Sequence, residues 1–311
     1  PAVSGMPARL SRKSANTPAT SGDYSADVVV GEDARVSWAV VDSGCRLEKG
    51  ARVGEDGPDE VDAAGHVAMS TGGLLVQRDG HTLLVDTGFG AVQMESPFGR
   101  VDCGALLDTL AALGVAPDDV DVVALTHLHP DHTGWMFTAD AGDPVFPRAT
   151  YVLAEAEWSP LAGGAPDADA GIAAIVSGLQ RHPLLRLVAD GEDVVPGVTA
   201  LVTPGHSSGH ASYVVRTARG ARVVAFGDAF HAPAQLGHPE WRSAPDAEPA
   251  RVPEARRRIV DVLLAPDTYG FAVHFGDQPF GRVTSDGGVP RWEPVAAPVI
   301  APPPGTIRSA T

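Results

Sequence analysis

The sequence predicts an α+β protein built as a four-layer αβ/βα sandwich, in which two β-sheets pack face to face and helices cover both outer faces. Two observations lead to this fold class. Short β-branched runs occur in two groups along the chain, and each group is followed by helical periodicity. The 311 residues are 44% hydrophobic, which is enough to bury a core of several layers, and we find no internal repeat of fixed period.

The first group of strands is expected to form a β-meander. The segment between residues 45 and 65 is polar and rich in Gly and Asp, so we interpret it as a loop. Asp79-Gly80 is a turn signal between two later runs. The expected strands of this group are residues 27–30, 35–41, 67–77 and 82–85.

Helices enter after this meander. Leu106, Leu110 and Leu113 recur at helical spacing, which predicts an amphipathic helix over residues 101–113 that Gly114 ends. Residues 120–125 are almost all apolar, as is typical of a strand buried on both faces. The later expected elements are strands at 150–153, 184–188, 198–202, 212–215, 222–226 and 270–275, and helices at 170–179 and from Pro253 onward.

These elements predict one domain between two irregular ends. Residues 1–25 are rich in Ser, Ala, Thr and Pro and are interpreted as a flexible N-terminal arm. Residues 26–295 form the one expected domain, and residues 296–311 form a Pro/Ala-rich C-terminal tail. The arm is compatible with a homodimer, because it could wrap a partner subunit.

Composition limits the partners and the cellular address. The net charge is −16, which argues against nucleic acid, since a phosphate backbone requires a basic surface. The one dense basic run, Arg256-Arg257-Arg258, is interpreted as a solvated helix face. No apolar stretch is long enough to span a membrane and none is typical of a signal peptide, so the expected address is cytoplasmic. Cys45 and Cys103 are expected to be reduced and buried.

The strongest chemical signal is His127-Leu128-His129-Pro130-Asp131-His132, placed directly after the buried strand. A strand end is rigid and the turn after it can curl, so three imidazoles and a carboxylate can converge on one side. Zinc and similar metals prefer imidazole nitrogen and carboxylate oxygen. Asp131 and His132 are adjacent and point in different directions, so they can serve two different ions.

Further candidate ligands stand at the ends of later strands. His206 follows the tight turn at Pro204-Gly205, and Asp228 follows Gly227. His274 is flanked by apolar residues, so a core histidine is the competing interpretation. His210 is better suited to a supporting role behind the ligands than to binding a metal.

Together these residues resemble the metallo-β-lactamase superfamily, and Leu84-Val85-Asp86-Thr87-Gly88 resembles its early strand-and-turn motif. The resemblance covers roughly residues 72–282 and implies the fold predicted above. It also implies two divalent metal ions, with zinc as the first expectation. One ion would take His127, His129 and His206, the other Asp131, His132 and His274, and Asp228 would bridge them with a hydroxide. Asp131 would accept a proton as water attacks.

The segment after Asp228 resembles the methyl parathion hydrolase-like and lactonase-like branch. Quorum-quenching lactonases usually carry a Tyr three residues after the bridging Asp, whereas this chain has His231. We therefore expect His231 to act in catalysis or in substrate binding, with a purely structural role as the alternative. Trp135 and Phe230 are further candidates for contacts with a small-molecule substrate.

The function predicted from these residues is hydrolysis of an ester-like bond: a lactone, a carboxylic ester or an aryl phosphotriester. The resemblance leaves two alternatives, an acyl thioesterase of secondary metabolism and an iron-dependent oxygenase of the same fold. His129 argues against flavo-diiron proteins, which usually have Glu there, and a persulfide dioxygenase would leave Asp131 without a metal. A nuclease is disfavoured by the net charge, and a non-catalytic binding protein by the complete ligand set.

Overall fold

The computed structural model describes residues 25–26, 37–42, 47–49, 67–96, 99–139, 142–163, 170–182, 185–216, 220–276 and 278–295. The expected strand at 27–30, nearly all of the N-terminal arm and the C-terminal tail lie outside these residues. Within them, no helix combines the length and the apolar character that crossing a membrane requires.

The first of two seven-stranded sheets is antiparallel at its beginning and parallel at its end. From β1 to β6 neighbouring strands run antiparallel, whereas β6, β9, β10 and β11 run parallel. In spatial order its strands are β1 (Ser25–Ala26), β2 (Ser37–Asp42), β5 (Gly72–Arg78), β6 (His81–Val85), β9 (Val122–Ala124), β10 (Thr150–Ala154) and β11 (Leu185–Val188).

The second sheet keeps its strands in chain order and is antiparallel except between β15 and β16. The strands are β12 (Asp193–Val195), β13 (Val198–Val202), β14 (Ala211–Arg216), β15 (Arg222–Ala225), β16 (Thr268–Phe271), β17 (Phe280–Asp286) and β18 (Val289–Pro294).

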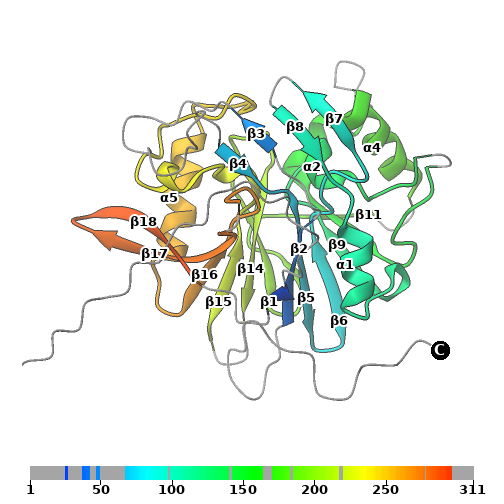
Figure 1. The fold of residues 1–311 in the computed structure, drawn as a ribbon, viewed down its shortest axis with the longest axis horizontal. Helices are drawn as coiled ribbons and strands as arrows, with labels where there is room; N and C mark the ends of the chain where they lie inside the picture. Colours follow the sequence, from blue (N-terminus) through cyan, green and yellow to red (C-terminus); the bar gives the residue numbers. More distant parts are fainter. Residues whose placement is uncertain are drawn as a thin grey trace, which may run out of the picture.

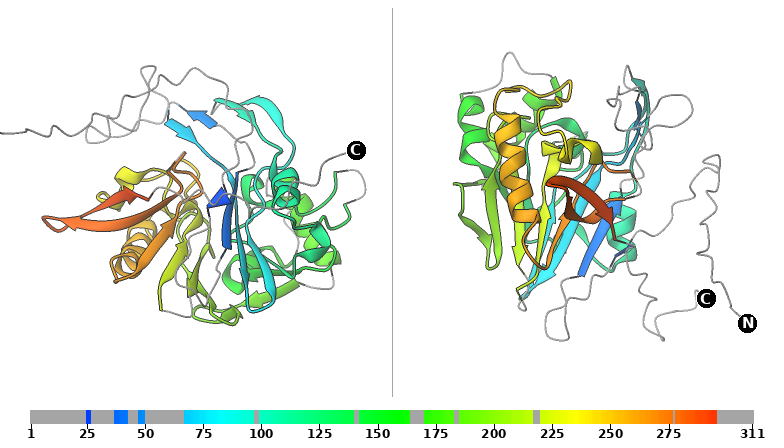
Figure 2. Two further views of the ribbon diagram at one scale, coloured as in Figure 1. Left: turned by 60° about the horizontal axis from the view of Figure 1, so that its bottom comes forward. Right: turned by 90° about the vertical axis from the view of Figure 1, so that its left-hand side faces the viewer.

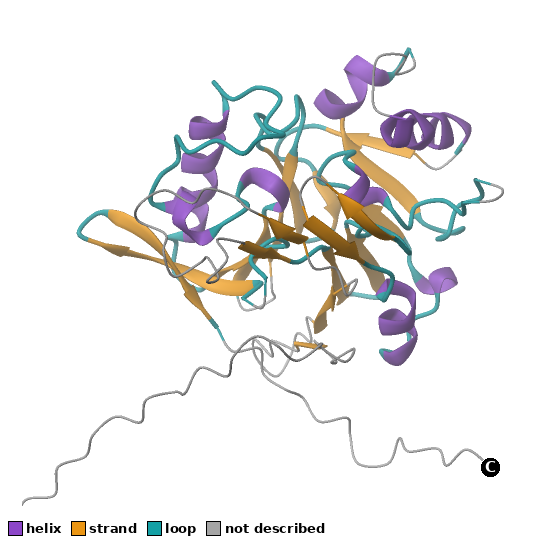
Figure 3. Cartoon of the chain, turned by 45° about the horizontal axis from the view of Figure 1, so that its top comes forward, coloured by secondary structure: helices purple, strands orange, loops and turns teal. Residues whose placement is uncertain are grey.

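Successive side chains of a strand point to opposite faces of its sheet, and this alternation divides the core into layers. Leu74 and Val76 of β5 point between the two sheets, where they join Tyr213 and Val215 of β14 in one buried cluster. Leu75 points the other way, into a cluster with side chains of the helices α1 (Leu106–Ala112) and α4 (Ala170–Arg181). A third cluster packs α5 (Val252–Leu263) against the outer face of the second sheet. Figures 1 and 3 show the resulting order of helix, sheet, sheet and helix, which confirms the predicted four-layer αβ/βα sandwich.

Smaller elements gather at one end of the sheets. Two short strand pairs, β3 (Leu47–Lys49) with β4 (Val67–Met69) and β7 (Gln93–Ser96) with β8 (Gly99–Asp102), lie side by side there (Figure 2). The short helices are α2 (Pro130–Thr133) and α3 (Glu155–Trp158), with 3₁₀ turns at Pro117–Asp119, Ser159–Leu161, Gly227–Ala229 and Pro233–Leu236.

Three predicted elements have different boundaries. The helix expected over residues 101–113 begins only at Leu106, because residues 99–102 pair with β7 as β8. The strand expected over 67–77 is interrupted at residues 70–71, between β4 and β5. The strand expected over 270–275 ends at Phe271, so His274 stands on a turn beyond the strand end.

Two predictions about single residues are wrong. Arg256 has no exposed surface, because three consecutive helical residues point in three directions and its direction is the core. Arg257 is exposed, as expected, and Arg258 forms an ion pair with Asp190. Cys103 is disulfide-bonded rather than reduced, and Cys45 lies outside the described residues.

Candidate metal centre

The centre lies where strands of both sheets end. β9 ends at Ala124, and the chain then passes through His127 to His129, whose backbone is extended, and into the single turn of α2. Pro130 stands at the start of that turn, where a missing N–H costs nothing. Asp131 and His132 follow within this turn and belong to one donor set, so the expectation that they serve two different ions is wrong. From the second sheet come His206 after β13, Asp228 after β15 and His274 after β16.

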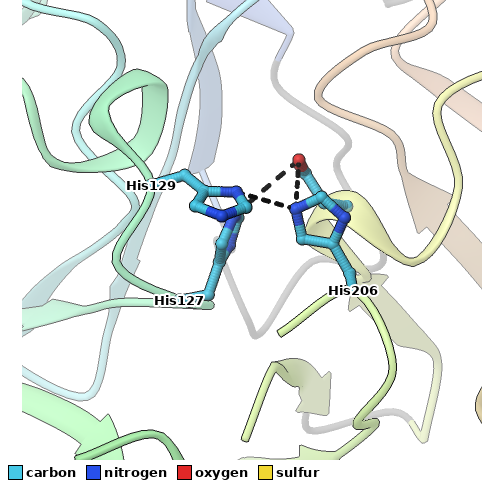
Figure 4. A group of neighbouring side chains, drawn as sticks. His127, His129 and His206 are labelled. Carbon is cyan, nitrogen blue, oxygen red and sulfur yellow. Dashed lines mark hydrogen bonds and ion pairs between the residues drawn. The ribbon is translucent and has the colours of Figure 1, made fainter. Parts of the chain in front are cut away.

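A first group of metal donors surrounds one oxygen of Asp228. It consists of His127, His129, His206 and Asp228, whose ligand atoms all lie within 4.8 Å of one another. His206 Nε2 is 3.1 Å from Asp228 Oδ2 and 2.9 Å from His129 Nδ1, and His127 Nε2 is 3.8 Å from the same oxygen. Figure 4 shows His127 and His129 approaching from one side and His206 from the other.

A second group surrounds the other oxygen of Asp228. His132 Nε2 and His274 Nε2 lie 2.9 and 2.8 Å from Asp228 Oδ1. The same two nitrogens lie 3.6 and 3.7 Å from Asp131 Oδ2. Asp131, His132, Asp228 and His274 therefore form a second compact donor set, and Asp228 belongs to both sets.

The outer nitrogens of the histidines show that these sets fit cations. His274 Nδ1 lies 2.8 Å from the carbonyl oxygen of Ser70, which can only accept, so Nδ1 carries the proton. In the neutral ring, Nε2 therefore carries a lone pair that faces the carboxylate of Asp228. This contact is favourable only when a positive charge lies between the two groups or on one of them. The buried side-chain atoms without a hydrogen-bond partner include His127 Nε2, His132 Nε2, His274 Nε2 and Asp228 Oδ1. These atoms all face the two donor sets, as metal ligands would.

The pKa values in the metal-free chain reflect the same crowding. Burial and then the neighbouring histidines 132 and 129 hold the pKa of His127 well below 6.5. Burial also lowers the pKa of His132, but Asp228 and then Asp131 outweigh it, so that this pKa lies well above 6.5. For Asp228, burial raises the pKa, yet His132 and His274 bring it well below 3.8. When no metal ion is bound, protons on some of these imidazoles therefore balance the negative charge of the Asp228 carboxylate.

Most ligands are oriented by a second group on their outer nitrogen. His132 Nδ1 lies 2.8 Å from Asp86 Oδ2, and Asp86 also accepts hydrogen bonds from the backbone and the hydroxyl of Thr126. His206 Nδ1 lies 3.1 Å from Asp246 Oδ1. The sequence singled out Asp86 through its strand-and-turn motif, but it missed Asp246 and the carbonyl of Ser70, which no pattern connects to their histidines.

Two further buried groups support the loops that carry the ligands. Glu157 accepts hydrogen bonds from the backbone N–H of Leu128 and Gly209 and from the hydroxyl of Ser207, so it joins the loops of His127 and His206. His210 Nε2 accepts the backbone N–H of Asp228 at 3.1 Å, which is the supporting place that the sequence favoured for this histidine.

The three candidate substrate contacts lie in different environments. His231 Nε2 is 3.2 Å from Asp228 Oδ2, and its side chain keeps 15% of its surface exposed. Burial lowers the pKa of His231 to about 4, although Asp228 raises it. Phe230 has no exposed surface and packs with Phe226 and Arg256 in the core under α5, so the expectation that it contacts substrate is wrong. Trp135 is half-buried at the edge of the core cluster of the first sheet, and its role stays a prediction.

Comparisons with known proteins point to one family. A sequence model of the metallo-beta-lactamase superfamily matches residues 73–272. The N-acyl homoserine lactonase AttM of Azorhizobium caulinodans is 32% identical over 165 residues, which are 46% of this chain and 58% of the relative. The metallo-beta-lactamase domain-containing protein 1 of Mus musculus is 30% identical over 181 residues, which are 58% of this chain and 55% of the relative. The chain thus spans a little over half the length of these curated relatives.

Solved structures share the fold. Hydrolase AbOPH of the beta lactamase superfamily superposes with a TM-score of 0.71 at 24% identity, covering 89% of this chain and 99% of its own. AidC, a dizinc quorum-quenching lactonase, superposes with a TM-score of 0.66 at 20% identity, covering 75% of this chain and 82% of its own.

Proposed function

The chain belongs to the metallo-beta-lactamase superfamily, and we propose that it is a binuclear metal-dependent hydrolase of ester-like bonds. The observation that carries this proposal is the sharing of Asp228 between two compact donor sets, one on each of its carboxylate oxygens. Two divalent ions held so close together, zinc being our first candidate, would supply a hydroxide nucleophile at neutral pH and polarise the substrate oxygen.

The residues of the chain divide the remaining work. Asp131 keeps 20% of its side-chain surface exposed, whereas the histidines of its donor set keep at most 1%. We assign to Asp131 the proton that leaves the attacking water, because it is the more exposed of the two acidic ligands. His231 keeps 15% of its side-chain surface exposed and lies 3.2 Å from Asp228, and it is our candidate for contact with the substrate. Trp135, close after the metal motif, is the proposed apolar contact.

The substrates that we propose first are lactones and carboxylic esters. Support comes from relatives named as N-acyl homoserine lactonases, among them those of Azorhizobium caulinodans and Bacillus thuringiensis. Aryl phosphotriesters and acyl thioesters present the same kind of polarised oxygen and leaving group, so they belong in the test as competing substrate classes.

The test combines metal analysis with a turnover panel. We expect two equivalents of bound transition metal per chain and turnover of at least one lactone or aryl ester. Asp228→Asn weakens one ligand of both sets and is expected to lower metal content and activity together. Asp79→Asn, on an exposed turn, is the matched control and should change neither. Less than one equivalent of metal in the wild-type protein, or no turnover of any of the four substrate classes at full metal loading, would refute the proposal.

The cellular compartment and the oligomeric state are further proposals. The sequence favoured the cytoplasm, but the disulfide at Cys103 favours an oxidising compartment, since reduced thiols prevail in the cytosol. A homodimer is expected from the N-terminal arm, and the molar mass in solution measured by light scattering tests it.

A further inference from the structure

His231 lies between a carboxylate of the metal centre and a chain of hydrogen bonds behind it. On its inner side, Nε2 lies 3.2 Å from Asp228 Oδ2. On its outer side, Nδ1 lies 2.8 Å from the hydroxyl oxygen of Ser243. The ring also stacks on that of His274 at 5.2 Å between centroids and 6° between planes, so it has little freedom to turn. Which nitrogen carries the proton therefore depends on Ser243.

The amide of Gln235 determines which way the Ser243 hydroxyl points. Its Oε1 accepts the backbone N–H groups of His231 at 2.7 Å and Ala232 at 3.2 Å, and a backbone N–H can only donate. Its Nε2 lies 3.2 Å from the carbonyl oxygen of Trp241, which can only accept. The oxygen and the nitrogen of this amide are thus assigned by neighbours on both sides. The second hydrogen of Nε2 is donated to Ser243 Oγ at 3.2 Å.

Because Ser243 Oγ accepts from Gln235, its own hydrogen is free to be donated. Among the residues that the structure describes, His231 Nδ1 is the acceptor paired with this hydroxyl. A ring nitrogen that accepts carries no proton, so the neutral ring of His231 carries its proton on Nε2.

We propose that Gln235 and Ser243 are positioning residues that hold His231 as a neutral Nε2–H donor facing the reaction site, and that this donor binds an oxygen atom of the scissile ester group. This inference rests on the proposed function and deepens it. His231 is then a hydrogen-bond donor and not a general base, because its one unprotonated nitrogen faces Ser243, away from the site.

The chemistry of the ester gives this donor its effect. As water adds to the acyl carbon and the C–O bond breaks, the electron pair of that bond goes to the leaving oxygen, and negative charge develops on oxygen. A hydrogen bond to that oxygen strengthens as the charge grows, so the donor stabilises the transition state more than the substrate. Sulfur is only a weak acceptor, so a donor directed at the leaving atom favours lactones and carboxylic esters over acyl thioesters.

The direct test is the protonation pattern of the ring. In metal-loaded protein labelled with ¹⁵N in its histidines, two-bond ¹H–¹⁵N correlation spectra distinguish a ring protonated on Nε2 from one protonated on Nδ1. We expect His231, assigned by its absence in His231→Gln, to carry its proton on Nε2. Ser243→Thr retains the hydroxyl and should keep this pattern, whereas Ser243→Ala removes the donor and should weaken or lose it.

Gln235→Glu provides a sharper variant. A carboxylate at 235 can still accept the N–H groups of His231 and Ala232, but it cannot donate to Ser243. The Ser243 hydroxyl would then turn to Glu, so His231 Nδ1 must donate and Nε2 loses its proton. A role in folding alone would not reverse the protonation of one ring while the remaining histidine signals stay in place.

Kinetics with 4-nitrophenyl acetate and an N-acyl homoserine lactone measure the consequence. Removal of one such donor typically lowers kcat about 10²- to 10³-fold. We expect a loss in this range for His231→Leu, a much smaller loss for His231→Gln, which retains an N–H donor, and little change in KM. Ser243→Ala should lower kcat and Ser243→Thr should preserve most of it. Ser285→Ala, on an exposed strand end, is the matched control.

The outcomes separate this inference from the proposed function. A wild-type His231 protonated on Nδ1, or an unchanged ring and unchanged kcat in Ser243→Ala, would overturn the inference even if the protein hydrolyses esters. Protonation on Nε2 that depends on Ser243, in a protein that hydrolyses none of the esters, would support the hydrogen-bond chain and refute its role in catalysis together with the proposed function.

Discussion

Asp86 offers a change that should weaken one metal site and spare the other. Its carboxylate accepts three hydrogen bonds: Oδ1 from the backbone N–H of Thr126 at 2.8 Å, and Oδ2 from the Thr126 hydroxyl at 2.9 Å and from His132 Nδ1 at 2.8 Å. Asp86→Asn preserves the size of the side chain. It also suits the backbone, because Asp86 has a φ of 59°, a region that Asn tolerates well.

The expected loss follows from the direction of these bonds. The amide oxygen of Asn can replace Oδ1, but the amide nitrogen, placed where Oδ2 was, is a donor that faces the donor His132 Nδ1. To accept this bond, His132 must move its proton to Nε2, the atom that lies 2.9 Å from Asp228 Oδ1 and belongs to the second donor set. Loss of such an outer partner typically costs 10–100-fold in metal affinity. That is about 1.4–2.8 kcal/mol, close to the roughly 1.5–3 kcal/mol of one hydrogen bond to a charged group.

Competition titration of metal-free protein against a chromophoric zinc chelator measures this loss. We expect two binding steps, of which Asp86→Asn shifts one by 10- to 100-fold and leaves the other within about twofold. Asp121→Asn is the matched control, because Asp121 also accepts a backbone N–H, that of Thr82 at 2.9 Å, at the opposite end of β9. Equal weakening of both steps, or no change in either, would refute the assignment of Asp86 to the second site alone.

Three further predictions address protons, packing and the disulfide. Burial lowers the pKa of His206, but Asp228 and Asp246 raise it to about 9, and the pKa of His274 is raised as well. Metal binding must therefore displace protons from these two histidines, so zinc affinity should rise between pH 6.5 and 9. The raised pKa values also stabilise the metal-free protein below pH 6.5, and this stabilisation is lost as pH passes about 9, so its melting temperature should fall over this range. A constant melting temperature would contradict the raised pKa values. Arg256→Met leaves the carbonyl oxygens of Ala229, Pro239 and Trp241 without their donor and should cost about 3 kcal/mol or more in urea unfolding, whereas exposed Arg257→Met should cost under about 0.5 kcal/mol. Thiol titration of the denatured chain should find no free thiol before reduction and two after it, and a free thiol before reduction would contradict the disulfide at Cys103.

The sequence predicted which candidate donors lie together, because their positions follow from a simple rule. Each donor stands within a few residues of a strand end, and strand ends can be recognised from apolar runs. To predict that His206, Asp228 and His274 lie near the motif, we needed only the expectation that the strand ends of the two sheets meet. His274 lies on a turn rather than on a strand, yet its chemistry was recognised because the length of the strand did not matter to the argument.

The groups behind the donors could not be predicted in this way. His274 is oriented by the backbone carbonyl of Ser70, 204 residues away, and a carbonyl has no sequence signature. Asp246 lies in an irregular segment and becomes a partner of His206 only because of how that segment folds. Arg256 was interpreted as solvated because a run of three arginines suggests an exposed face, whereas its helix directs one of them inward. Charge alone does not indicate exposure, because backbone carbonyl oxygens accept hydrogen bonds from Nε and Nη1 of this buried guanidinium.

One irregular segment connects metal binding to the proposed substrate contact. Asp246 Oδ2 accepts the backbone N–H of Ser243 at 2.7 Å, and Asp246 Oδ1 faces His206 Nδ1, while the hydroxyl oxygen of Ser243 lies 2.8 Å from His231 Nδ1. Arg256 holds the same segment through the carbonyl of Trp241. A ligand of the first metal set and the proposed donor to the substrate thus depend on one loop. A shift of that loop would change both together, so a lid or an insertion evolving there would alter substrate choice only by also altering the metal site. Part-buried hydrogen bonds thus hold this loop in one arrangement, although it contains neither helix nor strand.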